Sequence, residues 1–132
     1  MREMRYFVPI RPIAWKRAGV RFQTQSFFDT QKAEKIAIGC HISKQHANQA
    51  LFKVAAIHIN FLFKETNKQK TSPHYPWHAQ TPDIDNLLKL IFDALTGICF
   101  IDDCVIAKIS SEKRWAPNNA IEIIITELSR SI

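Results

Sequence analysis

The sequence has 132 residues, of which 46% are hydrophobic and 23% are charged. This composition excludes a disordered or fibrous chain and is typical of one globular domain, residues 1–132. No apolar run approaches the roughly 20 residues that cross a bilayer, and the charged start at residues 1–6 does not resemble a signal peptide. Three cysteines without disulfide or zinc spacing fit a reducing compartment, so we expect a cytoplasmic location.

The charge is positive and unevenly distributed. Eighteen Lys and Arg residues against twelve Asp and Glu residues give a formal net charge of +6. Residues 1–70 hold 13 basic and 4 acidic side chains, whereas residues 71–132 hold 5 basic and 8 acidic ones. A basic surface favours a polyanionic partner such as nucleic acid, because phosphate contacts release bound counterions. A surface charge that only keeps the protein soluble explains the same numbers.

The first half of the chain predicts two strands and a helix. Residues 4–10 alternate in polarity and predict a strand, which Pro9 and Pro12 confine to a sheet edge or end early. Asp29 then fits the cap of a helix with an apolar face formed by Ala33, Ile36, Ala37 and Cys40. Residues 53–64 predict the clearest strand, because apolar side chains alternate with more polar ones along it.

The second half predicts a long loop, a helix and two strands. In the loop at residues 64–80, Trp77 lies between His74 and His78; these residues could contact an opened base or make ordinary loop contacts. Residues 84–96 predict a helix that Gly97 ends. Residues 104–115 and 120–128 predict strands joined as a hairpin through residues 117–119. The order β-α-β-α-β-β predicts an α+β fold with a mixed or antiparallel sheet and two main helices.

Three aspartates are the strongest candidates for chemistry. Asp83 and Asp85 stand at the start of the second helix, and Lys89 follows Asp85 by one turn on the same face. Capping of the helix start alone could explain the two carboxylates. Residues 97–103, if extended, are long enough to return along the helix, so Asp103 could reach the same end.

Converging carboxylates in a basic protein favour a bound cation. Three ionised carboxylates repel one another unless a cation neutralises them. Ligands that are all oxygen suit Mg²⁺, with Mn²⁺ as the other possibility. Such a site can activate water against a phosphodiester, and Lys89 would offset the negative charge that develops there. Ordinary capping and turn aspartates remain the alternative.

The same residues resemble a known family. The stretch from Thr81 to Lys89 has the pattern D-x-D-N-x-x-K, residues 93–97 have D-A-L-x-G, and Asp102 and Asp103 form a D-D pair before the next strand. These three parts, in this order and over about 23 residues, resemble the RusA family. The family consists of Holliday junction resolvases, small endonucleases of DNA recombination and repair that prophages often carry.

The resemblance implies a function and a set of site residues. It implies a Mg²⁺-dependent endonuclease that cleaves four-way DNA junctions as a homodimer, with Asp83, Asp85 and Asp103 as metal-binding catalytic residues. It also implies that Lys89 is the essential basic residue, and Asp102 is the alternative third carboxylate. Residues 12–22 loosely match the N-terminal pattern of the family, which makes Lys16, Arg17 and Arg21 candidate contacts to DNA phosphates.

Two other functions fit the sequence less well. A non-catalytic module that binds branched DNA would have no use for repulsive carboxylates near phosphate. A phosphodiesterase acting on another nucleic acid or phosphoryl substrate is the second alternative. The chain has no glycine-rich phosphate loop, so we expect no nucleotide cofactor.

Overall fold

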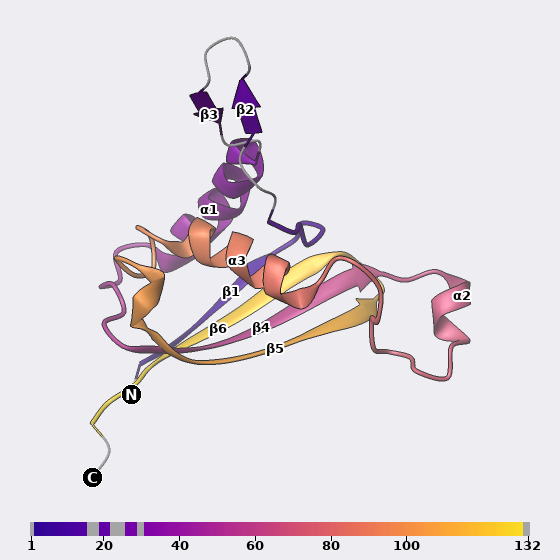
Figure 1. Cartoon of the computed structure of the whole chain (residues 1–132). Coiled ribbons are helices and arrows are strands. Elements are labelled where there is room, and N and C mark those ends of the chain that lie inside the picture. The colour runs from indigo at the N-terminus through magenta and orange to yellow at the C-terminus, as the bar shows by residue number, and fades with distance from the viewer. Residues whose placement is uncertain (1, 16–18, 22–25, 29–30, 131–132) are drawn as a thin grey trace.

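A mixed sheet of four strands forms the centre of the protein (Figure 1). The computed structural model describes residues 2–15, 19–21, 26–28 and 31–130. In spatial order the strands are β1 (Glu3–Val8), β6 (Ala120–Glu127), β4 (Ala55–Lys64) and β5 (Ile106–Ala116). β4 runs parallel to β5 and antiparallel to β6, and β1 is antiparallel to β6. β1 therefore lies at an edge of the sheet, as its prolines predict.

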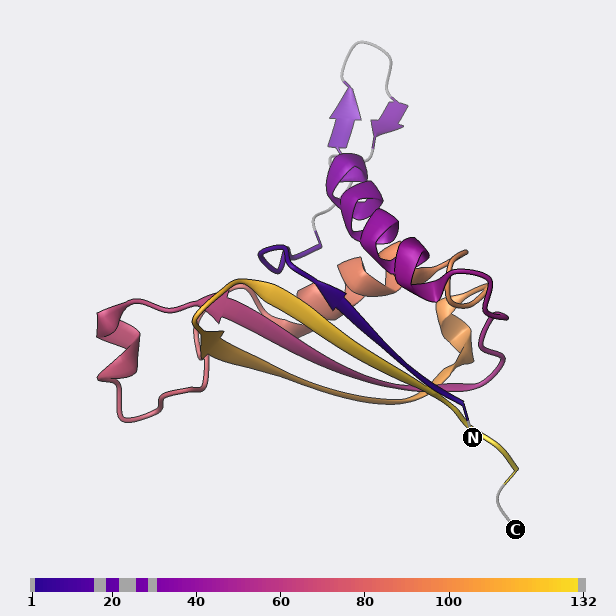
Figure 2. The same ribbon diagram turned by 180° about the vertical axis from the view of Figure 1, so that it is seen from behind.

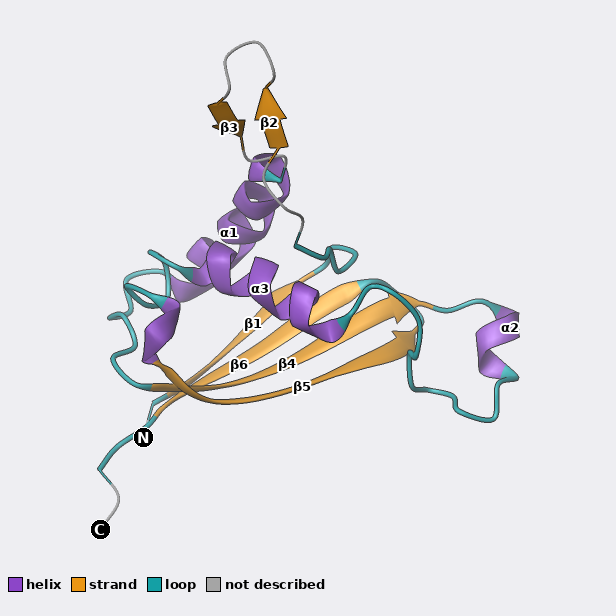
Figure 3. Ribbon diagram, in the orientation of Figure 1, coloured by secondary structure: helices purple, strands orange, loops and turns teal. Residues whose placement is uncertain are grey.

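Two helices cover one face of this sheet (Figures 1 and 2). They are α1 (Lys32–His46) and α3 (Ile84–Leu95); α2 (Asn67–Lys70) and the 3₁₀ helix η1 (Asp103–Val105) are short. β2 (Gly19–Arg21) and β3 (Ser26–Phe28) form a separate antiparallel pair that the sequence pattern does not predict (Figure 3). The predicted α+β fold and element order are confirmed. Among the described residues, every helix is too short or too polar to cross a membrane.

The core lies between the sheet and the two helices. The inward side chains of β4 are at most 2% exposed: Ala55, Ile57, Ile59, Phe61 and Phe63. Opposite them, α3 buries a stripe formed by Leu87, Leu90, Ile91, Ala94 and Leu95. Burial of each large apolar side chain contributes about 1.5–3 kcal/mol, so this contact fixes α3 on the sheet.

The predicted hairpin of the last two strands is wrong, because β4 lies between β5 and β6. β4 buries its whole inner face and is paired along both edges, which gives it a central place in the sheet. The connection between β5 and β6 instead passes the end of β4. There the side-chain oxygen of Asn119 accepts a hydrogen bond from the Lys64 amide at 2.8 Å, and the Ala116 carbonyl accepts one from the Glu65 amide at 2.9 Å.

The predicted apolar face of α1 is also wrong. Its buried residues are Ile38, Gly39, Ile42 and His46. The four predicted core positions are exposed: Ala33, Ile36, Ala37 and Cys40. Apolar residues occur around much of this helix, so two stripes fit helical spacing, and packing against β1 and α3 decides between them. Asp29, the predicted cap, lies outside the described residues, and Gln31 occupies the N-cap position.

Candidate active site

The start of α3 presents two carboxylates to solvent. Asp83 is the N-cap residue and has extended backbone angles, yet its side chain makes no capping hydrogen bond. Asp85 lies in the first turn, where one of its carboxylate oxygens accepts a hydrogen bond from the Asn86 amide at 2.9 Å. Both residues are exposed. Capping therefore does not account for the Asp83 side chain, which remains available to a ligand.

Lys113 holds the segment that leads into α3. Its ammonium nitrogen donates hydrogen bonds to the carbonyl oxygens of Gln80 at 2.6 Å and Pro82 at 2.8 Å. Burial lowers the pKa of Lys113, and the nearby charge of Asp83 opposes this shift. The contact links the end of β5 to the residue immediately before Asp83, so the sheet positions this carboxylate.

Lys89 lies against an aromatic ring rather than in an ion pair within the described residues. Its ammonium nitrogen is 3.7 Å from the centroid of the Trp15 ring, and the Trp15 amide donates to the Asn86 carbonyl at 2.8 Å. Packing over the indole face restricts the position of this cation. The N-terminal segment thus packs on the first turns of α3, directly beside the two carboxylates.

The basic residues that follow Trp15 cannot be placed in the same detail. Lys16 and Arg17 lie outside the described residues, and Arg21 belongs to β2 without a described side chain. The predicted DNA contacts therefore rest on the sequence. The structure adds that the chain just before Lys16 and Arg17 contacts α3 through Trp15.

Asp103 lies at the other end of α3 in a single chain. The backbone does not run back along the helix, because it turns at once: the Gly97 amide donates to the Phe100 carbonyl at 2.7 Å, and Gly97 has a φ of 86°. Asp103 then begins η1, before β5. A helix of 12 residues is about 18 Å long, and Asp103 lies beyond the end of α3 opposite to Asp83, near Asp93.

Asp103 has acidic neighbours of its own. Desolvation raises the pKa of Asp103, and a hydrogen bond with Asp102 and the charges of Asp102 and Asp93 raise it further. Hydrogen bonds from Cys104 and Asp103 lower the pKa of Asp102. Within one chain, the described residues include no group of three or more His, Cys, Asp or Glu side chains arranged to bind a metal ion.

The start of α3 nevertheless offers suitable oxygen donors. Mg²⁺ keeps several waters and commonly takes only one or two protein carboxylates. Asp83 and Asp85 supply two such ligands at one end of the helix. Their carboxylate oxygens are the type of ligand that Mg²⁺ binds. The third predicted ligand, Asp103, does not join them within the same chain.

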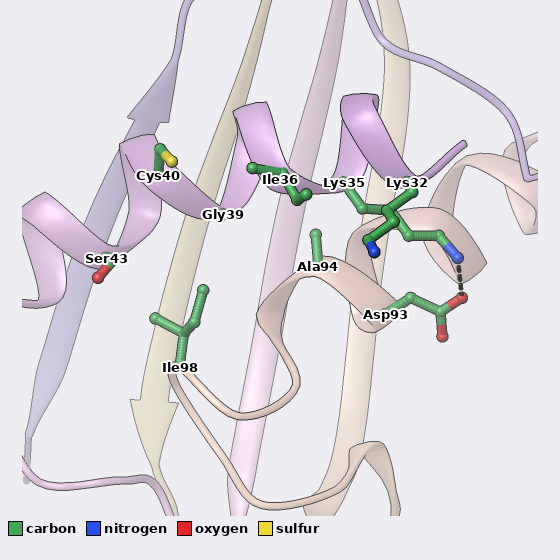
Figure 4. A pocket seen from close by; sticks show the side chains of 9 residues that line it. All are labelled: Lys32, Lys35, Ile36, Gly39, Cys40, Ser43, Asp93, Ala94 and Ile98. Carbon is green, nitrogen blue, oxygen red and sulfur yellow. Dashed lines mark ion pairs between the residues drawn. The ribbon is translucent and has the colours of Figure 1, made fainter. Parts of the chain in front are cut away.

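An apolar hollow between α1 and α3 is separate from this site (Figure 4). Its walls include Ile36, Ala94 and Ile98, and an ion pair of 3.4 Å between Lys35 and Asp93 lies at one side. Asp93 therefore links the two helices. No carboxylate from the start of α3 lines this hollow.

Comparison with known proteins identifies the family of this chain. The family model for endodeoxyribonuclease RusA matches residues 9–126. The chain belongs to the RusA endodeoxyribonuclease family. The crossover junction endodeoxyribonuclease rusA of Lactococcus phage r1t is 27% identical over 103 residues, which are 77% of this chain and 78% of that protein. The predicted family and enzyme class are thus confirmed, and RusA-family nucleases are metal-dependent.

Sequence reasoning misses two residues that shape this candidate site. Lys113 lies on the inward face of β5, paired with Phe61 of β4, and the sequence holds no signal for this because the pairing of β5 with β4 is not predicted. Trp15 stands in a basic stretch without periodicity, so its contact with Lys89 had no signal in the sequence.

Proposed function

We propose that this chain cleaves branched DNA, with four-way junctions as its substrate, by hydrolysis of a phosphodiester at the start of α3. The observation that carries the proposal is the pair of exposed carboxylates Asp83 and Asp85 in a RusA-family endodeoxyribonuclease, of which Asp83 makes no capping hydrogen bond. Neighbouring Lys89 supports it, because a cation beside the carboxylates can approach a phosphate.

Each side chain has a distinct task in this proposal. Asp83 and Asp85 hold Mg²⁺, or Mn²⁺ in its place, through carboxylate oxygens. The bound ion supplies activation of water and neutralisation of phosphate charge. Lys89, held over the Trp15 ring, balances negative charge on the phosphate oxygens. Lys16, Arg17 and Arg21 contact the DNA backbone and add affinity without sequence preference.

The position of Asp103 supports a homodimer. In one chain Asp103 lies at the far end of α3, but a second copy related by a two-fold axis across this helix would bring its own Asp103 to Asp83 and Asp85. Two exposed apolar residues support such a contact: Ile101, 78% exposed, directly precedes the acidic pair, and Ile109, 44% exposed, lies on the face of β5 that α3 shares. A symmetric dimer also suits a substrate that is cut symmetrically in two strands.

Cleavage of a labelled synthetic four-way junction tests the proposed function. We expect paired, symmetric nicks with Mg²⁺ or Mn²⁺, none with chelator, and little cleavage of a linear duplex. Asp83→Asn should lower the cleavage rate at least about 100-fold, because it removes a charged ligand, while junction binding in chelator persists. Glu3→Gln, which removes an exposed carboxylate from β1 at the opposite edge of the sheet from β5, is the matched control and should keep activity. Tight junction binding without nicks under either metal would make the chain a binding module instead.

A further inference from the structure

Trp77 is an exposed aromatic side chain on a firmly held loop. The residue is 53% exposed, although indole rings are usually largely covered in folded proteins. It belongs to the segment between α2 and α3, which projects beyond the ends of β4 and β5 (Figure 1). The contacts that hold this loop show why the ring is exposed.

Backbone hydrogen bonds attach this loop to the edge of β5. Trp77 and Arg114 form an antiparallel bridge. The Trp115 amide donates to the Pro76 carbonyl at 2.8 Å, and the His78 amide donates to the Lys113 carbonyl at 3.1 Å. The loop thus behaves locally as a short extra strand, whose successive side chains point to opposite sides.

His78 anchors this segment from the inner side. The residue is buried, and its ring centroid lies 4.2 Å from those of Phe63 and Trp115. Because His78 points inward, its neighbour Trp77 is held pointing outward. A fixed aromatic ring loses little conformational entropy on binding and is a suitable platform for stacking.

The surroundings of Trp77 are positively charged. The guanidinium carbon of Arg114 lies 5.3 Å from the centroid of the Trp77 ring. A hollow beside the ring is also lined by Lys68, His74 and Gln80, which offer a cation and hydrogen-bonding groups. The nearby carboxylate of Glu65 is already engaged by the Tyr75 hydroxyl and Lys70. An anionic ligand with a flat face matches this combination of a ring and cations.

The platform lies at the end of the sheet where α3 begins. Two successive residues of β5 contact the candidate active site and the Trp77 loop. Lys113 holds the segment before Asp83, and Arg114 forms the bridge with Trp77. The Lys113 side chain points to the face that α3 covers, so Arg114 and Trp77 lie on the opposite face of the same edge, and DNA that reaches both places must cross this edge.

We propose that Trp77, with Arg114 beside it, stacks on an unpaired nucleobase of the branched DNA substrate. The inference rests on the proposed function, since it concerns the same substrate. The ring supplies a face that any base can stack on, and Arg114 and Lys68 face the adjoining phosphates. This contact would favour a branch point over continuous duplex, in which every base is paired and stacked.

The test uses the full chain with chelator, so that binding is measured without cleavage. The probe is a four-way junction with one unpaired 2-aminopurine at the crossing point, whose fluorescence is quenched by stacking, and a linear duplex serves for comparison. Trp77→Ala should abolish protein-induced quenching and weaken junction binding by about 5- to 150-fold, the range expected for loss of one stacked base. Duplex affinity should change less than about 2-fold by the same reasoning.

Two further variants separate stacking from folding. Trp77→Phe keeps an aromatic face and should retain most of the quenching and affinity. Phe7→Ala removes an aromatic side chain of similar exposure, 51%, from β1 at the opposite edge of the sheet, and should bind as the wild type does. Unchanged quenching in Trp77→Ala, or equal losses for duplex and junction, would overturn the stacking platform. Failure of the wild type to cleave any junction with metal would instead refute the proposed function.

Discussion

Tyr6 and His46 form a buried polar pair in the core. The Tyr6 hydroxyl lies 2.6 Å from Nδ1 of His46, and both residues are at most 3% exposed. The other ring nitrogen, Nε2, is buried and has no hydrogen-bond partner among the described residues. Tyr6→Phe would leave both nitrogens unsatisfied, so we expect it to lower the free energy of unfolding by about 1–3 kcal/mol. Urea denaturation checks this value; an unchanged midpoint would mean that the pair contributes nothing.

We expect His78 to make the stability of the fold depend on pH. Burial lowers the pKa of His78, and the charge of Lys113 lowers it further. The unfolded chain therefore takes up this proton first, near pH 6.5, and stability falls as the pH decreases below that value. Well above a pH of about 6.5 the His78 ring is neutral in the folded and the unfolded chain and does not affect stability.

The variant His78→Phe isolates this contribution, because phenylalanine keeps an aromatic ring between Phe63 and Trp115 without a titrating group. Urea midpoints of wild type and variant at about pH 7.5 and 5.5, on either side of the unfolded histidine pKa, check the effect. We expect the wild type to lose more stability on acidification than the variant. Equal losses would show that another group carries the pH dependence.

At the level of elements, Gly97 controls the end of α3. Its φ of 86° lies in the left-handed region, and no atom lies within 4 Å of the position that a Cβ would take. Gly97→Ala therefore meets no steric clash with neighbours, only the backbone cost of about 1–2 kcal/mol. Thermal unfolding should show a corresponding decrease in Tm, and a variant as stable as the wild type would contradict this origin of the helix end.

The sequence predicts elements better than their pairing. Alternation identifies β4, and the stripe that includes Leu87, Ile91 and Leu95 identifies α3, because each element has one dominant face. It does not show that β4 separates β5 from β6, since strand order depends on contacts between distant residues. The face of α1 is equally hidden, because Ile36 and Ile38 fit alternative stripes and only tertiary packing distinguishes them.

At the level of the whole molecule, the sequence selects the candidate site residues but does not show how far apart they lie. The motif selects Asp83, Asp85 and Lys89, and α3 places them at one helix end. The distance from this end to Asp103 depends on the tight turn after α3, which chain length alone does not reveal. The separation within one chain leads to the proposal that two copies share each site.

Mixing two inactive variants tests this central claim most directly. If Asp103 acts on the Asp83–Asp85 end of the other copy, Asp83→Asn and Asp103→Asn should each be inactive alone. After subunit exchange, a mixed dimer has one site with every carboxylate intact, so junction nicking should return in one strand. Binding in chelator should be similar for all samples and serves as the control. If the mixture stays inactive although the wild type cleaves and subunits exchange, the carboxylates do not combine across two copies and the shared site is refuted.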